Sequence, residues 1–186
     1  MKNTEKKILL AATKLFSEYG YKGVSTRKIA EQAGVNEITI FRYFESKSNL
    51  LQAVIRHFAF EGNIIEKISK DITGCIKEDI HIFANVYYMF LENNIKMYKI
   101  QIREINEEGR RFTNSIDYTD FMKAYFKQKV EEGKFKGDPY LVSTSIVSMI
   151  MGIFTLKVFS PQIYEEIDHK ELITRFVDDI AKLYCI

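Results

Sequence analysis

Residues 24–47 decide the fold, and they read VSTRKIAEQAGVNEITIFRYFESK. Ser25 or Thr26 can cap a first short helix, because a hydroxyl oxygen accepts a hydrogen bond from the free backbone N–H groups of the first turn. Gly34 can end that helix in the left-handed conformation, and Asn36 can cap the next one. A helix, a tight glycine turn and a second helix form a helix-turn-helix, whose second helix enters the major groove of DNA.

The second helix of this motif has two chemically different sides. Placing residues every 100° around a helix separates an inward side from an outward side. We predict that Ile40, Phe41 and Phe44 pack on the preceding helices. The outward side is then formed by Ile38, Thr39, Arg42 and Tyr43.

The outward residue types suit DNA. Thr39 can hydrogen-bond a base edge, Ile38 can make apolar contact, and Arg42 can reach guanine or a phosphate. Thr26, Arg27 and Lys47 lie at helix starts, where free N–H groups and the helix dipole attract a phosphate. Glu37, at the start of the second helix, can accept a hydrogen bond from the N4 amino group of cytosine. Each of these residues could instead be an ordinary solvated side chain. The predicted DNA-binding residues are Thr26, Arg27, Asn36, Glu37, Ile38, Thr39, Arg42, Tyr43 and Lys47.

Charge and apolar spacing extend this domain toward the amino terminus. From Thr4 the apolar positions follow helical spacing as far as Tyr19, and Gly20 can end that helix. Residues 1–50 carry nine Lys or Arg against five Glu, which is +4, so the other 136 residues of a chain with net charge +2 sum to −2. Because DNA is an anion, the basic part of the chain is the part expected to bind it. We assign residues 1–47 to a DNA-binding domain.

Residues 48–186 are predicted to form a separate helical domain. Of the 25 Phe and Tyr residues only six precede residue 51, and the whole chain has two prolines, which argues against a many-stranded fold. The class is therefore all-α, with about nine helices. The fourth helix is predicted to run from Ser46, which can cap it, to about Lys70. The later helices are predicted at about 78–93, 95–107, 114–132, 139–158 and 168–184, and Asp138 and Asp168 are the expected caps of the last two.

The helix at 139–158 contains eighteen residues, Pro139 to Leu156, without a charge. That length could span a membrane, but serine and threonine are costly in lipid, and small residues at 3-4-3 spacing let a second helix approach. We expect this helix and the last one to form a symmetric four-helix dimer interface; packing within one subunit is the alternative. The expected interface residues are Ser145, Ser148, Gly152, Thr155, Phe176 and Ile180.

Aromatic residues at helical spacing run through the middle of the chain. Together with a few polar groups they could line a mostly apolar ligand pocket, but they could equally form an ordinary core. We expect the ligand to be a small apolar or aromatic molecule. The candidate pocket residues are Phe58, Phe83, Tyr87, Phe90, Tyr98, Phe121 and Tyr125.

Other functions find little support in the sequence. There is no glycine-rich phosphate loop and no metal-ligand spacing, so no catalytic residue, metal or cofactor is expected. The two cysteines, Cys75 and Cys185, are too few for a disulfide framework, and they are expected to be plain thiols. No leader sequence is recognisable, which favours the cytoplasm.

The stretch from Ser25 to Lys47, with Leu50 in register after it, closely resembles the DNA-binding domain of TetR-family regulators. The resemblance covers roughly residues 4–55. Two positions depart from the family pattern, because Phe41 stands where tyrosine is usual and Ile38 stands where a small residue is usual. The bulky Ile38 on the outward side leaves the operator sequence open.

This resemblance implies a homodimer whose body binds an inducer and whose two recognition helices bind a palindromic operator. It implies a ligand-responsive repressor. Activation or ligand-independent regulation are alternatives that the sequence does not separate from repression. A further alternative is a different class of protein, a helical small-molecule carrier or enzyme that does not act on DNA.

Overall fold

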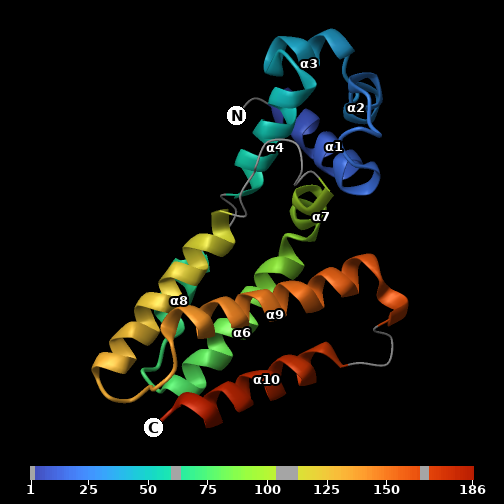
Figure 1. Ribbon diagram of the computed structural model, residues 1–186. Coiled ribbons are helices and arrows are strands. Elements are labelled where there is room, and N and C mark those ends of the chain that lie inside the picture. Colours follow the sequence, from blue (N-terminus) through green and yellow to red (C-terminus); the bar gives the residue numbers. More distant parts are fainter. Residues whose placement is uncertain (1–2, 60–63, 104–112, 164–167) are drawn as a thin grey trace. The chain divides into compact units, whose positions relative to one another are not determined.

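The computed structural model describes residues 3–59, 64–103, 113–163 and 168–186, without the side chains of 58–59, 113–116 and 163. The described residues form ten α-helices and one short 3-10 helix, with no β-sheet (Figure 1). The predicted all-α class is confirmed, and about nine helices was close to the observed number.

The chain divides into two compact units. The first, which we call the HTH unit, falls within residues 1–62 and 94–111, and the second, which we call the body, falls within residues 63–93 and 112–186. The HTH unit thus combines residues that precede α6 (Ile76–Asn93) in the sequence with residues that follow it. The division follows packing and not the order of the sequence. It contains α1 (Asn3–Tyr19), α2 (Thr26–Ala33), α3 (Glu37–Phe44), α4 (Lys47–Ala59) and α7 (Ile95–Arg103).

The predicted caps of the HTH unit are confirmed. The side-chain oxygens of Ser25, Asn36 and Ser46 each accept a hydrogen bond from a backbone N–H two or three residues later, at 3.0–3.2 Å. Gly20 and Gly34 end α1 and α2 with φ of 73° and 67°, a conformation that glycine adopts without steric cost. Local sequence therefore sets where these helices begin and end.

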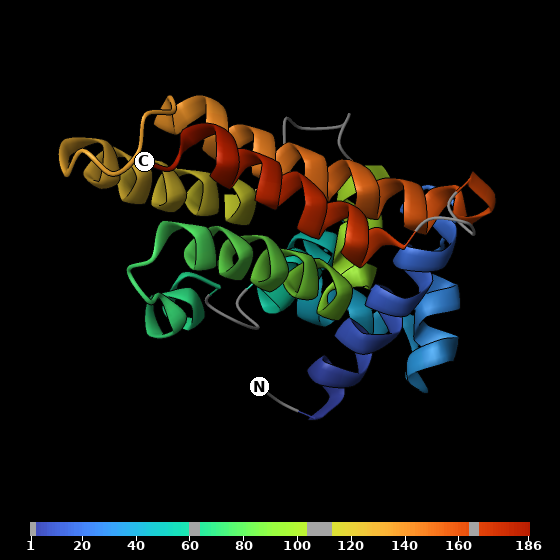
Figure 2. The ribbon, with the colours of Figure 1, turned by 90° about the horizontal axis from the view of Figure 1, so that it is seen from below.

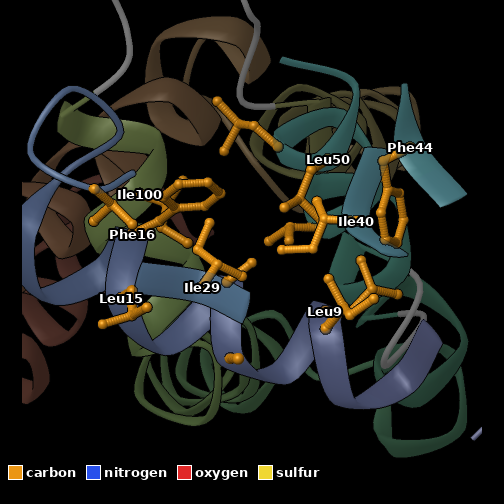
Figure 3. Close-up of a cluster of buried hydrophobic side chains, with 14 of the residues drawn as sticks. Leu9, Leu15, Phe16, Ile29, Ile40, Phe44, Leu50 and Ile100 are labelled. Carbon is orange, nitrogen blue, oxygen red and sulfur yellow. The ribbon is translucent and has the colours of Figure 1, made fainter. Parts of the chain in front are cut away.

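The core of the HTH unit gathers side chains from all five of its helices (Figure 3). Phe16 of α1, Ile29 of α2 and Ile40 of α3 are completely buried there. Ile100 of α7 joins the same cluster, and Arg103 donates a 2.7 Å hydrogen bond to the backbone oxygen of Ser17. The small motif is thus completed by a helix from a distant part of the chain.

The predicted fourth helix, from Ser46 to about Lys70, crosses residues 60–63, which lie outside the described residues. On either side of them the structure has α4 (Lys47–Ala59) and α5 (Ile64–Asp71). α4 packs on α1 and α3, while α5 packs on α6 and α8.

The body is a layered helical bundle (Figures 1 and 2). α6 packs against α5, α9 and α10, and α8 packs against α9 and α5. The predicted starts are confirmed at α9, where the Asp138 carboxylate accepts from two N–H groups with Pro139 following, and at α10, where Asp168 does the same. The helices of the body are α5 (Ile64–Asp71), α6 (Ile76–Asn93), α8 (Thr113–Glu131), α9 (Pro139–Phe159) and α10 (His169–Tyr184), with η1 (Pro161–Ile163) after α9.

α9 is the most apolar helix of the body. Among the described residues it is the one helix whose length and composition would allow it to cross a membrane, and 39% of the residues in its most apolar stretch are buried. Those buried residues pack on α6, α8 and α10. The helix is therefore part of a helical core, with a second apolar side left uncovered.

A buried carboxylate ties α6 to the loop before it and to α8. Asp79 is completely buried, and it accepts hydrogen bonds from the backbone N–H of Thr73 at 2.7 Å, from the Thr73 hydroxyl at 3.0 Å and from the backbone N–H of Gly74 at 3.0 Å. The Tyr125 hydroxyl donates a fourth bond at 2.5 Å. Burial and this bond to a carboxylate both raise the pKa of Tyr125 far above its usual value, so the phenol stays a donor.

Replacing this carboxylate is expected to destabilise the body. Asp79→Ala leaves four donors without their acceptor in a buried site, which should lower the free energy of unfolding by about 3 kcal/mol. The matched control is Asp71→Ala, at an exposed position of α5, with an expected change within about 0.5 kcal/mol. Urea unfolding followed by circular dichroism measures both; equal stability of the two variants would contradict the assigned role.

Candidate functional sites

The recognition helix α3 is held by one narrow apolar strip. Ile40 is completely buried and Phe44 is 7% exposed, while Ile38 on the opposite side is 74% exposed. The prediction for Phe41 was wrong, because this side chain is 44% exposed instead of packed. Ile40 and Phe44 are four residues apart and lie one above the other, whereas Phe41 is turned by 100° from Ile40 and misses the core.

Two of the predicted outward residues are only half exposed. Tyr43 packs against the core of the HTH unit, with its ring centroid 6.2 Å from that of Phe44 and 5.6 Å from the Arg42 guanidinium carbon. Thr39 is also half-buried. The fully outward surface of α3 is therefore built by Ile38, Phe41 and Arg42, of which sequence reasoning missed Phe41.

The acidic residue of α3 has a partner within the protein. The Thr26 hydroxyl donates a 2.5 Å hydrogen bond to Oε1 of Glu37. This bond joins the first residue of α2 to the first residue of α3, so that it sets the angle between the two helices of the motif. An acid that would repel phosphate is thereby kept close to a neighbouring hydroxyl.

Basic side chains lie at the starts of α2 and α4. Lys47, the first residue of α4, lies with Nζ 4.2 Å from the ring centroid of Tyr21, and Lys28 of α2 lies 4.0 Å from that of Tyr19. Arg27 is exposed and pairs with Glu31 at 3.2 Å. The sequence predicted Arg27 and Lys47 here but not Lys28, whose position beside an exposed aromatic ring needed the tertiary structure.

The predicted aromatic residues of the body pack mostly on one another. Phe83 and Tyr87 of α6 are completely buried, and Phe83 lies 5.0 Å from the ring of Tyr125 and 6.2 Å from that of Phe121. Phe90 is half-buried and stacks on Tyr87. A ligand pocket among these rings stays a prediction. Two other candidates lie apart from the group, since Tyr98 belongs to the HTH unit and the side chain of Phe58 lies outside the described residues.

The structure instead shows a cavity of about 430 Å³ between α6, α9 and α10. None of the predicted pocket residues lines it. Its one sequence signal is Lys157, the single charged residue of α9. The lining residues are Asn85, Tyr88, Met89, Glu92, Asn93, Lys157, Lys170 and Ile173.

A hydrogen-bonded triad of Lys157, Glu92 and Tyr88 lies on the wall of this cavity. Nζ of Lys157 donates to Oε1 of Glu92 at 2.5 Å and to the hydroxyl of Tyr88 at 2.8 Å. The bond from Lys157 lowers the pKa of Glu92. Burial would lower the pKa of Lys157, but its bonds to Glu92 and Tyr88 outweigh burial and raise it, so both groups are charged at neutral pH.

An uncovered surface runs along α9 and α10. On α9, Leu141, Ser148, Gly152 and Phe159 are exposed and lie within about 40° of one another around the helix axis at about 100° per residue. Ser145 and Thr155, beside them, are half-buried. A Cβ atom added at Gly152 would meet nothing within 4 Å, so this surface is open in the protomer.

The α10 side of this surface differs from the prediction at one residue. Leu172, Phe176 and Leu183 face outward and are exposed or half-buried. Ile180 is 6% exposed and packs within its own subunit, since it lies about 80° around the helix from Leu172. Leu183 takes its place on the outward side.

No group of three or more His, Cys, Asp or Glu side chains comes together as a metal site within the described parts of the chain. The features that stand out are a helix-turn-helix with an uncovered second helix, basic side chains around it, and a helical body with a cavity. They define the class of helix-turn-helix DNA-binding regulators.

Known proteins extend this assignment. Residues 8–54 match the bacterial regulatory proteins of the tetR family. The HTH-type transcriptional regulator YvkB of Bacillus subtilis (strain 168) is 32% identical over 160 residues, covering 83% of this chain and 82% of that protein. The fatty acid metabolism regulator protein of the same organism is 27% identical over 167 residues, covering 85% of each.

The fold of the whole chain is similar as well. The crystal structure of the transcriptional regulator FadR from Bacillus subtilis in complex with stearoyl-CoA superimposes with a TM-score of 0.65 at 21% identity, covering 96% of both chains. The chain belongs to the tetR family and is a DNA-binding transcriptional regulator. The resemblance seen in residues 25–47 is confirmed.

Two isoleucines of α3 provide a matched test of this geometry. Ile40→Ala removes a completely buried side chain and should lower the free energy of unfolding by about 3 kcal/mol. Ile38→Ala removes an exposed side chain on the same helix and should change it by less than about 0.5 kcal/mol. Urea unfolding measures both, and a large loss from Ile38→Ala would mean that α3 is turned differently.

Proposed function

We propose that the protein is a ligand-responsive repressor that binds a palindromic operator as a homodimer in the cytoplasm, with no enzymatic activity. The observation that carries the proposal is α3, whose outer side is uncovered while Ile40 and Phe44 fix its inner side in the core. A helix that is rigidly held and exposes its side chains is suited to the major groove. Transcriptional regulation by DNA binding is also the role of the family.

The proposed DNA contacts fall into two groups. Ile38, Phe41 and Arg42 project from α3 toward bases, where the two apolar side chains favour thymine methyl groups and Arg42 favours guanine. The predicted base contact of Thr39 is kept, although its side chain is half-buried. Phosphate contacts are proposed for the residues around the helix starts, where they position the motif without reading sequence. These residues are Thr26, Arg27, Lys28, Asn36, Tyr43 and Lys47. Glu37 is proposed to hold Thr26 in place.

A second subunit is proposed to cover the outward side of α9 and α10. Leu141, Leu172 and Leu183 are exposed by 56%, 39% and 61%, and small residues between them let a helix approach closely. The same surface on the partner would meet it across a two-fold axis, as a closed dimer requires. A palindromic operator would require the two recognition helices to lie about 34 Å apart, one turn of DNA. The proposed interface residues are Leu141, Ser145, Ser148, Gly152, Thr155, Leu172, Phe176 and Leu183.

The cavity of the body is the proposed ligand site. Its wall combines apolar groups from Met89 and Ile173 with two cations, Lys157 and Lys170, against one anion, Glu92. This chemistry suits a ligand with an apolar body and an anionic group, which would replace Glu92 as the partner of Lys157. Such a ligand is more polar than the apolar or aromatic molecule expected from the sequence. The FadR structure contains stearoyl-CoA, which is likewise an apolar chain with an anionic group.

Chain connectivity offers a route from this cavity to the DNA-binding helices. Glu92 and Asn93 end α6, and after Asn94 the chain enters α7 at Ile95. α7 supplies Ile100 to the core that holds α3. A ligand that frees Glu92 from Lys157 would change the end of α6, and hence the setting of α7. The ligand releases DNA if it binds more tightly to the altered state.

DNA binding is tested by gel-shift titration and footprinting on the region upstream of the protein's own gene. The footprint should show a protected palindrome, and Lys47→Ala should weaken binding to all duplexes while lowering the slope of log K against log salt by about one. Lys70→Ala, at an exposed position of α5 in the body, is the matched control and should change neither quantity. Failure to bind any duplex at low salt would refute the proposal.

The dimer is tested at Gly152, where the protomer has room for a side chain. Gly152→Leu should leave the helical circular dichroism spectrum unchanged but block the close approach of a second α9, giving a monomer in light scattering. Lys127→Leu, on an exposed position of α8, adds a similar apolar side chain elsewhere and should leave the dimer intact. A dimeric Gly152→Leu variant would place the interface elsewhere.

The ligand site is tested with dodecanoate, and with dodecanol as the uncharged counterpart. Bound ligand raises the unfolding temperature, so dodecanoate should shift it and dodecanol should shift it less. Lys157→Met should abolish the dodecanoate shift, whereas Glu92→Gln should enlarge it, because the competing carboxylate is gone. Equal shifts from both compounds, or an unaltered response of Lys157→Met, would exclude an anion site at Lys157.

A further inference from the structure

The two cysteines of the chain lie at one end of the body, 110 positions apart in sequence. Cys75 comes directly before α6 and is exposed; Cys185 comes directly after α10 and is half-buried. α6 and α10 pack against each other. Neither thiol is used by the DNA-binding surface, the dimer surface or the cavity.

α6 and α10 run antiparallel, with a register that contacts define. Near their middle, Nε2 of His81 and Oδ1 of Asp178 are 3.0 Å apart. Toward the end of α6, the cavity brings Met89 together with Lys170, near the start of α10. As residue numbers rise along α6 they therefore fall along the facing part of α10.

In this register the two cysteines lie at about the same height along the antiparallel helices α6 and α10. Cys75 is six residues before His81, and Cys185 is seven residues after Asp178. At about 1.5 Å per helical residue, the two steps are about 9 and 10.5 Å along antiparallel helices. Figure 1 accordingly shows the carboxyl end of α10 beside the first turn of α6.

Side-chain contacts connect the same two positions. Asp79 holds the loop before Cys75 and binds Tyr125, whose ring lies 5.5 Å from that of Phe126. The Phe126 ring lies 4.8 Å from that of Phe135, and Phe135 forms a backbone bridge with Cys185. Burial, and then the Cys75 thiol, raise the pKa of Cys185.

We propose that Cys75 and Cys185 are an oxidation site that closes to an intramolecular disulfide. Each residue lies directly beyond a helix end, and closing the bond requires 4.4–6.8 Å between their Cα atoms. Disulfides in cytoplasmic proteins are usually transient and redox-sensing, and the bond would tie α6 to α10 at the end opposite the cavity.

The oxidant is a peroxide. The exposed Cys75 sulfur attacks hydrogen peroxide, the O–O bond breaks, and a sulfenic acid and water form. The Cys185 sulfur then attacks the Cys75 sulfur, the S–O bond breaks, and the thiol proton leaves with hydroxide as a second water. Two thiols and one peroxide thus give one disulfide and two waters.

The full chain, reduced and then treated with hydrogen peroxide, tests this inference. Titration with a thiol reagent should fall from two thiols to none while light scattering shows an unchanged oligomer. Tryptic digestion should link the peptide 71–77 to the peptide 183–186. The unfolding temperature should rise by about 5 °C or more, because the bond closes a long loop, and dithiothreitol should reverse the rise.

Cys75→Ser and Cys185→Ser are the matched controls, and each should lose both the linked peptide and the redox-dependent shift. Disulfides only between subunits would overturn the proposal. A sulfinic acid at Cys75 beside an unmodified Cys185 would overturn it as well. Neither result bears on DNA binding, which is measured separately.

Discussion

The packing of Ile40 and Phe44 into the core of the HTH unit is the constraint on which the DNA-binding surface depends. α3 has only two turns, and an isolated helix of that length is unstable in water. Its conformation therefore comes from burial on one side, together with the Asn36 cap at its start. Because two side chains one above the other fix the rotation of the helix, they also decide which side chains of α3 face outward.

Polar bonds add orientation to that apolar anchor. The bond from Thr26 to Glu37 joins the starts of α2 and α3, and α7 closes the core from a later part of the chain. The DNA-binding motif is thus not a self-contained segment, since part of its core belongs to the helix that follows α6. This arrangement gives a change at the end of α6 a covalent path into the unit that holds α3.

In the body, α9 serves three different purposes on different sides of one helix. Its buried side is core, its outward side of Leu141, Ser148 and Gly152 is the proposed dimer surface, and Lys157 near its end reaches the cavity. An apolar helix with a single charge is costly to expose and costly to bury. The proposed second subunit would relieve the first cost, and the pairing of Lys157 with Glu92 relieves the second.

The sequence by itself determined the class of fold, the helix starts at Ser25, Asn36 and Asp138, and the family, because caps, glycine turns and apolar spacing act between residues a few positions apart. Only the tertiary structure decided that Phe41 is exposed, that Ile180 is buried and that Lys157 meets Glu92. These depend on the width of the facing surface and on contacts between distant helices. Angular position around a helix alone does not carry that information.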